Sequence, residues 1–111
     1  MNQLYANQPE RIDRNRRLVA ELKLIYGRSQ VTGDQLPPGL PQAQVVEVLE
    51  VHHIRPLSKD GADERSNMIV VTASLHALIH ADANCHIDLG QRTMVLFGVR
   101  LSLDVKPNHN G

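Results

Sequence analysis

The chain has 111 residues, and its 12 basic and 12 acidic residues give a formal net charge of zero with neutral histidine. This length corresponds to one small domain, residues 1–111, with a modest core. The zero net charge is not typical of a strong general DNA-binding protein. The single cysteine excludes an internal disulfide. No membrane-spanning apolar run and no signal-peptide pattern is present, so we expect a soluble, cytoplasmic protein with no membrane partner.

Residues 9–28 predict a helix, because Pro9 stands near the start of the segment and Gly27 at its end. An apolar stripe would dock this helix on the domain: Ile12, Leu18, Leu22 and Ile25. Basic residues outnumber acidic ones in the segment: Arg11, Arg14, Arg16, Arg17, Lys23 and Arg28 against Glu10, Asp13 and Glu21. The basic side chains either contact DNA phosphates or form a solvated charged face.

The next segments alternate between loops and short apolar runs. Residues 31–44 predict a loop, since they contain three prolines and two glycines. Residues 45–51 (VVEVLEV) are rich in β-branched side chains and predict a strand that leads into the histidine pair. Residues 68–72 (MIVVT) predict a second strand, and residues 54–66 form the loop between the two.

Residues 74–83 (SLHALIHADA) predict a helix, because Leu75, Leu78 and Ile79 recur at helical spacing beside a stripe with two histidines. Residues 85–89, 92–97 and 99–105 alternate apolar and polar residues and predict strands, with a hairpin turn at residues 90–91. These strands form their own antiparallel sheet or pair with the first strand. We expect residues 106–111 to fray, and we interpret His86 and His109 as satisfied core histidines.

Four histidines in the middle of the chain suit metal chemistry. His76 and His80 are four residues apart on a predicted helix, where Cβ atoms lie roughly 6 Å apart and can chelate one ion. Neighbouring strand residues point to opposite faces, so one of His52 and His53 can complete a three-histidine site. The other is free to act as a general base. Three protein ligands leave positions open for water and substrate; a purely structural metal site is the alternative.

The pattern E-V-H-H-I-x-P-L-S, then G-A-D-x-x-x-N, then H-x-x-x-H covers about a third of the chain and resembles HNH endonucleases of the ββα-metal class. The nearest form is the one found in nuclease colicins. The resemblance implies an α+β fold with a ββα-metal (His-Me finger) core at about residues 45–83, an N-terminal basic helix and extra C-terminal strands. It implies the following site residues: metal ligands His52, His76 and His80, general base His53, loop-pinning residue Asn67, and supporting carboxylate Glu50.

One feature of the family is missing. Many HNH proteins bind a structural zinc with two CxxC pairs, and the corresponding positions here read Ser29-Gln30-Val31-Thr32 and Thr72-Ala73-Ser74-Leu75. Neither stretch contains cysteine, so a four-cysteine structural zinc site is excluded. We expect apolar packing through Val31 and Leu75 in its place.

The resemblance implies a metal-dependent DNA endonuclease that hydrolyses a phosphodiester bond and nicks one strand of duplex DNA as a monomer. We expect low sequence specificity, because side chains for stacking on bases are few (Tyr5, Tyr26 and Phe97), unless a protein partner supplies it. Candidates for phosphate contacts are Arg55, Arg28 and Lys59.

Imidazole ligands favour a transition metal over Mg²⁺, so we expect Mn²⁺ for activity, with Mg²⁺, Ni²⁺, Co²⁺ or Zn²⁺ as alternatives. One alternative function is an inactive DNA-binding or phage packaging-associated HNH module. Another is an RNA nuclease or a colicin-like toxin.

Overall fold

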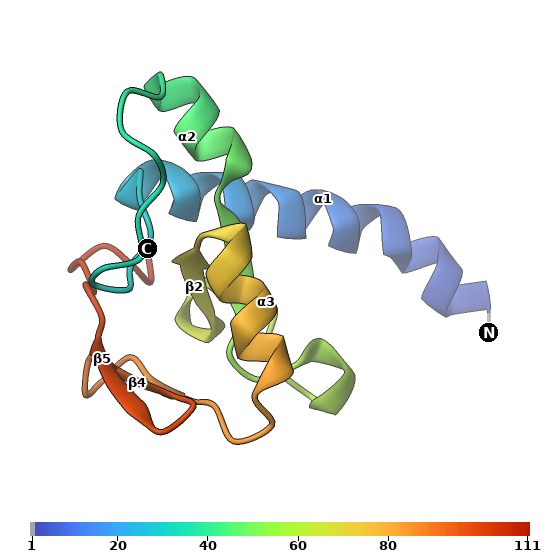
Figure 1. The fold of residues 1–111 in the computed structure, drawn as a ribbon. Coiled ribbons are helices and arrows are strands. Elements are labelled where there is room, and N and C mark those ends of the chain that lie inside the picture. Colours follow the sequence, from blue (N-terminus) through green and yellow to red (C-terminus); the bar gives the residue numbers. More distant parts are fainter. Residues whose placement is uncertain (1) are drawn as a thin grey trace.

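The computed structural model describes residues 2–111, with side chains from residue 12 onward (Figure 1). The elements follow in the order α1 (Asn2–Tyr26), α2 (Gln42–Val48), β1 (Glu50–His53), β2 (Met68–Val71), α3 (Ala73–Ala81), β3 (His86–Asp88), β4 (Thr93–Leu96) and β5 (Val99–Ser102). The described part of the chain is therefore an α+β fold, as predicted, and it has three helices and two small antiparallel sheets. Among its helices, none combines the length and apolar character that crossing a membrane requires.

The antiparallel pair β1–β2 divides the core into two apolar clusters. All four residues of β2 are buried, because both of its faces are covered. Ile69 and Val71 pack in one cluster with Leu75 and Ile79 of α3, while Met68 and Val70 pack in the other with Leu22 of α1. The β1–β2 pair therefore lies between α3 on one face and α1 on the other.

The register of this pair decides where the histidines point. His52 is paired with Ile69, and His53 is paired with Met68. Side chains of directly paired residues lie on the same face of a sheet. His52 consequently faces α3, and His53 faces α1.

The strand predicted for residues 45–51 is wrong in its first half, because Val45 lies in α2 and β1 begins only at Glu50. The helix starts directly after Pro41, whose fixed φ precedes the first turn. Val45 and Leu49, four residues apart, both pack in the cluster around Leu22. Tertiary burial of this pair overrides the β-propensity of the valines.

Helix α1 also differs from its prediction. It begins at Asn2 and so continues ahead of Pro9, and Figure 1 shows its N-terminal half projecting away from the rest of the fold. Leu22 is fully buried, whereas Ile12 is 48% exposed and does not belong to the docking stripe. A projecting helix tolerates an internal proline because water can solvate the carbonyl that loses its partner. The C-terminal half of α1 packs on the β1–β2 pair.

The C-terminal strands form their own three-stranded sheet in the order β3-β4-β5, which is one of the two arrangements predicted. Val31 joins it through an isolated bridge to Leu103, and Val31 and Leu75 are buried in the same cluster. Apolar packing therefore connects the two cysteine-free stretches, as expected. Asp34 adds a polar link, since its carboxylate accepts hydrogen bonds from the hydroxyl (2.6 Å) and the amide (3.0 Å) of Thr72.

The prediction that residues 106–111 fray is wrong. His109 is only 2% exposed and is a core residue, as expected, whereas His86 on β3 is exposed, so its assignment to the core is wrong. The Nδ1 of His109 lies 2.7 Å from the hydroxyl of Tyr26 and its Nε2 lies 2.7 Å from the carbonyl oxygen of Arg65. The Arg65 guanidinium donates to the carbonyls of His109 and Asn108. Contacts between residues far apart in the chain thus order the polar tail, residues 106–111, for which the local sequence predicts fraying.

Candidate metal centre

Helix α3 presents two histidines to β1 because its apolar stripe is anchored in the core. Leu75 and Ile79 are buried. His76 and His80 follow them by one residue each and lie on the neighbouring stripe. Thr72 defines the start of the helix, since its hydroxyl accepts the backbone N–H of Leu75 at 3.2 Å. The position of the histidine pair is therefore set by a cap and two buried side chains.

The structure brings together His52, His76 and His80, the three histidines that the resemblance assigns to the metal. One ring nitrogen from each lies within 4.8 Å of the others. The Nε2 atoms of His76 and His80 are 3.0 Å apart. Two nitrogens bound tetrahedrally to one ion at about 2.1 Å would be about 3.4 Å apart, which is close to the spacing of this pair. Together with His52, the two rings could hold a metal ion.

His52 is the buried member of the cluster, at 8% exposure. Its pKa is lowered to about 4, first by burial and then by the nearby imidazoles of His76, His80 and His53. At neutral pH the ring is thus uncharged, which is the form that binds metals.

Glu50 supports the cluster from β1. Its Oε1 lies 2.7 Å from Nδ1 of His76. An ionised carboxylate only accepts hydrogen bonds, so Nδ1 of His76 carries a proton, and in a neutral ring Nε2 then keeps its lone pair toward His80. A carboxylate that fixes a histidine in this way is typical of metal sites. Glu50 therefore contacts a histidine of the cluster directly.

His53 lies on the opposite face of β1, away from the three-histidine cluster, and is half-buried. Its Nε2 is 3.3 Å from Oδ1 of Asp63. The same oxygen accepts a hydrogen bond from the amide of Asn15 at 2.8 Å. His53 is thus contacted by the loop between the strands and, through Asp63, by α1.

Asn67 closes that loop. Its amide nitrogen donates to the carbonyls of Arg55 (2.9 Å) and Ala62 (2.8 Å), and its Oδ1 accepts from the amide of Arg55 (2.9 Å). Gly61 completes the turn, because a Cβ there would collide with the carbonyl oxygen of Arg55. Asn67 therefore pins the loop beside His53.

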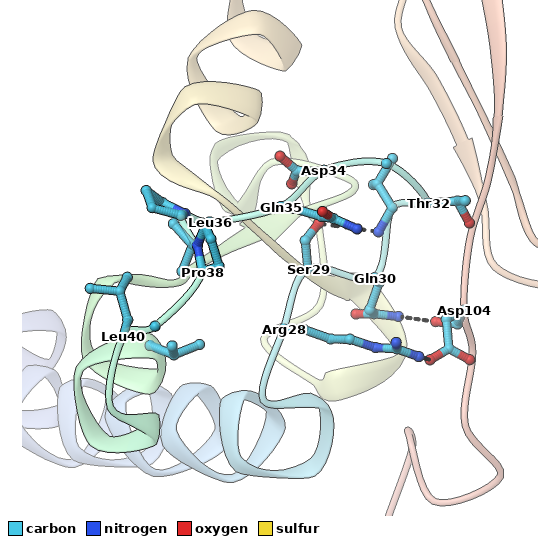
Figure 2. A pocket seen from close by; sticks show the side chains of 15 residues that line it. Arg28, Ser29, Gln30, Thr32, Asp34, Gln35, Leu36, Pro38, Leu40 and Asp104 are labelled. Carbon is cyan, nitrogen blue, oxygen red and sulfur yellow. Dashed lines mark hydrogen bonds and ion pairs between the residues drawn. The ribbon is translucent and has the colours of Figure 1, made fainter.

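The candidate phosphate contacts lie in different places. Arg55 and Lys59 are exposed on the loop, where the guanidinium of Arg55 donates to the Lys59 carbonyl at 2.7 Å. Arg28 pairs with Asp104 at 3.0 Å, and it lines a separate pocket of about 480 Å³ formed by residues 28–40, Val45 and Asp104 (Figure 2).

Sequence reasoning missed two residues beside His53. Asp63 stands inside the motif G-A-D-x-x-x-N, but its type alone assigns it no role. Asn15 contacts Asp63 across 48 positions of the chain. No local pattern predicts a contact of that range.

No family model, curated protein or solved structure matches this chain. A function is therefore inferred from the residues and geometry of the site.

Proposed function

We propose that this protein is a metal-dependent DNA endonuclease of the HNH type, which hydrolyses a phosphodiester bond and nicks one strand of duplex DNA with low sequence specificity. In this proposal β1, β2 and α3 form the ββα-metal core. The observation that carries it is the convergence of His52, His76 and His80, with His53 on the opposite face of the same strand.

His52, His76 and His80 would hold one divalent ion. When bound, the ion would stabilise negative charge on the scissile phosphate and on the leaving 3′ oxygen. Three imidazoles favour Mn²⁺ or another transition metal over Mg²⁺, which prefers oxygen ligands.

His53 would accept a proton from the water that attacks phosphorus in line with the leaving oxygen. The products would be a 5′ phosphate and a 3′ hydroxyl. Asn67 would keep the loop beside His53 in place, and Glu50 would keep His76 in its ligating tautomer. The exposed Arg55 and Lys59 would contact neighbouring phosphates.

Supercoiled plasmid tests this function. With Mn²⁺, the purified protein should convert it first to the open-circular form and only later to linear DNA, because one site cuts one strand at a time. EDTA should stop the reaction. Linear product without an open-circular precursor would indicate two coordinated sites, and equal activity in EDTA would disprove a metal mechanism.

His53→Ala should abolish nicking while the metal content stays unchanged, since His53 is outside the cluster. His86→Ala is the matched control, because His86 is an exposed histidine on β3. Loss of bound metal in His53→Ala would show that His53, and not His52, is a ligand.

A further inference from the structure

The contact between His53 and Asp63 links the loop between β1 and β2 to the face of β1 that α1 covers. The two side chains are 20% and 23% exposed, and the distance from Nε2 to Oδ1 is 3.3 Å. This is slightly longer than an ordinary hydrogen bond. Catalytic hydrogen bonds are often long before substrate binds.

The chemistry of the two groups decides which ring nitrogen carries the proton. An ionised carboxylate has acceptors and no donor. Nε2 of His53 must therefore carry the hydrogen that points at Asp63. In a neutral ring the other nitrogen, Nδ1, then keeps its lone pair. In hydrolases with a Ser-His-Asp triad, a carboxylate likewise fixes the tautomer and orientation of the histidine base.

Asp63 is itself held from two sides. The amide of Asn15 donates to Oδ1 at 2.8 Å. The side-chain amide of Asn67 donates to the backbone carbonyl of Ala62, the residue just before Asp63, at 2.8 Å. A helix side chain and a pinned loop thus place one carboxylate oxygen against the His53 ring.

We propose that Asp63, held by Asn15 of α1, is a positioning residue that fixes His53 in the Nε2–H tautomer, so that the proton of the attacking water is taken up at Nδ1. This inference rests on the proposed nuclease function. Asp63 acts through His53 and does not contact the phosphate. Helix α1 thereby contributes to the reaction through Asn15 as well as to packing.

The tautomer can be measured without any nuclease activity. A long-range ¹H–¹⁵N correlation spectrum of histidine-labelled protein, with Zn²⁺ in place of paramagnetic Mn²⁺, reports which nitrogen is protonated. At about pH 8, above the ordinary histidine pKa, His53 should show Nε2–H, and Asp63→Ala should give a mixture of tautomers. The signals are assigned by their loss in His53→Ala. An Nδ1–H tautomer in the unmodified protein, or an unchanged spectrum in Asp63→Ala, would overturn the proposal.

Nicking kinetics supply the second measurement. Asp63→Ala should lower kcat about 10- to 100-fold, part of the roughly 10²- to 10⁴-fold that a general base contributes, while KM stays within about twofold. Asn15→Ala should also lower kcat, but by a smaller factor. It serves as the test variant if Asp63→Ala does not fold. Asp60→Asn is the matched control, since Asp60 is exposed in the same loop with φ 63°, a conformation that asparagine tolerates.

An unchanged kcat in both variants would refute the role of Asp63. A protein that never nicks plasmid with Mn²⁺ would refute the nuclease function instead. The tautomer spectrum still decides in that case whether Asp63 fixes His53, so the two failures are distinguishable.

Discussion

At the scale of single residues, the site depends on carboxylates that each control one histidine. Glu50 holds Nδ1 of His76, on the face of β1 that α3 covers. Asp63 holds Nε2 of His53, on the face that α1 covers. Because each carboxylate accepts only, each ring presents its unprotonated nitrogen on the side away from the carboxylate.

Glu50→Gln tests this control at the metal cluster. A glutamine amide can donate to Nδ1 of His76, which would move the ring proton to Nε2 and block that ligand. We expect metal affinity to fall about 10- to 100-fold, as is typical when such supporting groups are lost. Calorimetric titration with Zn²⁺ measures it, with Glu47→Gln, an exposed glutamate of α2, as the control. Unchanged affinity would remove Glu50 from the site.

Asn67→Ala tests the loop beside His53. Three hydrogen bonds would be lost, so we expect the free energy of unfolding to fall by about 1–3 kcal/mol and nicking to slow strongly, with bound metal unchanged. Urea unfolding, metal analysis and nicking rates measure these effects. Asn84→Ala, at an exposed asparagine, should alter none of them. A nicking rate equal to that of the unmodified protein would show that the pinned loop does not orient His53.

At the scale of elements, α3 is placed by polar bonds at its start as well as by its apolar stripe. Thr72 caps the helix through Leu75 and bonds Asp34 with both its hydroxyl and its amide. Asp34 follows the first cysteine-free stretch and Thr72 begins the second. Hydrogen bonds and the packing of Val31 and Leu75 in one apolar cluster thus join the two cysteine-free stretches.

Thr72→Ala removes the cap and the hydroxyl bond to Asp34. We expect a loss of about 1–2 kcal/mol in the free energy of unfolding, and weaker metal binding because His76 and His80 lie on this helix. Urea unfolding and Zn²⁺ titration measure the two effects. Ser74→Ala in the exposed first turn of α3 is the control. Stability equal to that of the control would contradict the role of Thr72.

At the scale of the whole molecule, the C-terminal tail connects α1 to the loop before β2. The carbonyl of Arg65 accepts from Nε2 of His109, so Nδ1 of the neutral ring accepts from the Tyr26 hydroxyl. Burial is the main cause that lowers the pKa of His109 below 6.5. The tail is therefore built around an uncharged histidine.

This arrangement predicts acid sensitivity. In the unfolded chain His109 takes up a proton near pH 6.5, whereas the folded protein resists protonation until a lower pH. The stabilisation is complete above about pH 6.5 and is lost as pH falls toward the lowered pKa. Free energies of unfolding measured in EDTA across this range should fall less steeply for His109→Ala than for the unmodified protein. His86→Ala, at an exposed site, should keep the original slope; equal slopes in all three would refute the prediction.

The sequence alone determined the features that repeat locally. Helical spacing predicted His76 and His80 on one stripe of α3, and strand alternation placed His52 and His53 on opposite faces. The role of Asn67 in the loop between the strands came from the resemblance carried by the motif G-A-D-x-x-x-N. The helical and strand features depend on backbone periodicity, which neighbouring residues control.

Only the tertiary structure decided the rest. Val45 became helical because it packs with Leu49 against α1, and the tail became ordered because His109 enters a buried site between Tyr26 and Arg65. Asp63 contacts His53 on the face of β1 that α1 covers, and Asn15 donates a hydrogen bond to Asp63. Each of these outcomes depends on burial and on hydrogen bonds between residues far apart in the chain. The free energy of such contacts depends on which partners the fold brings together, and local sequence does not contain that information.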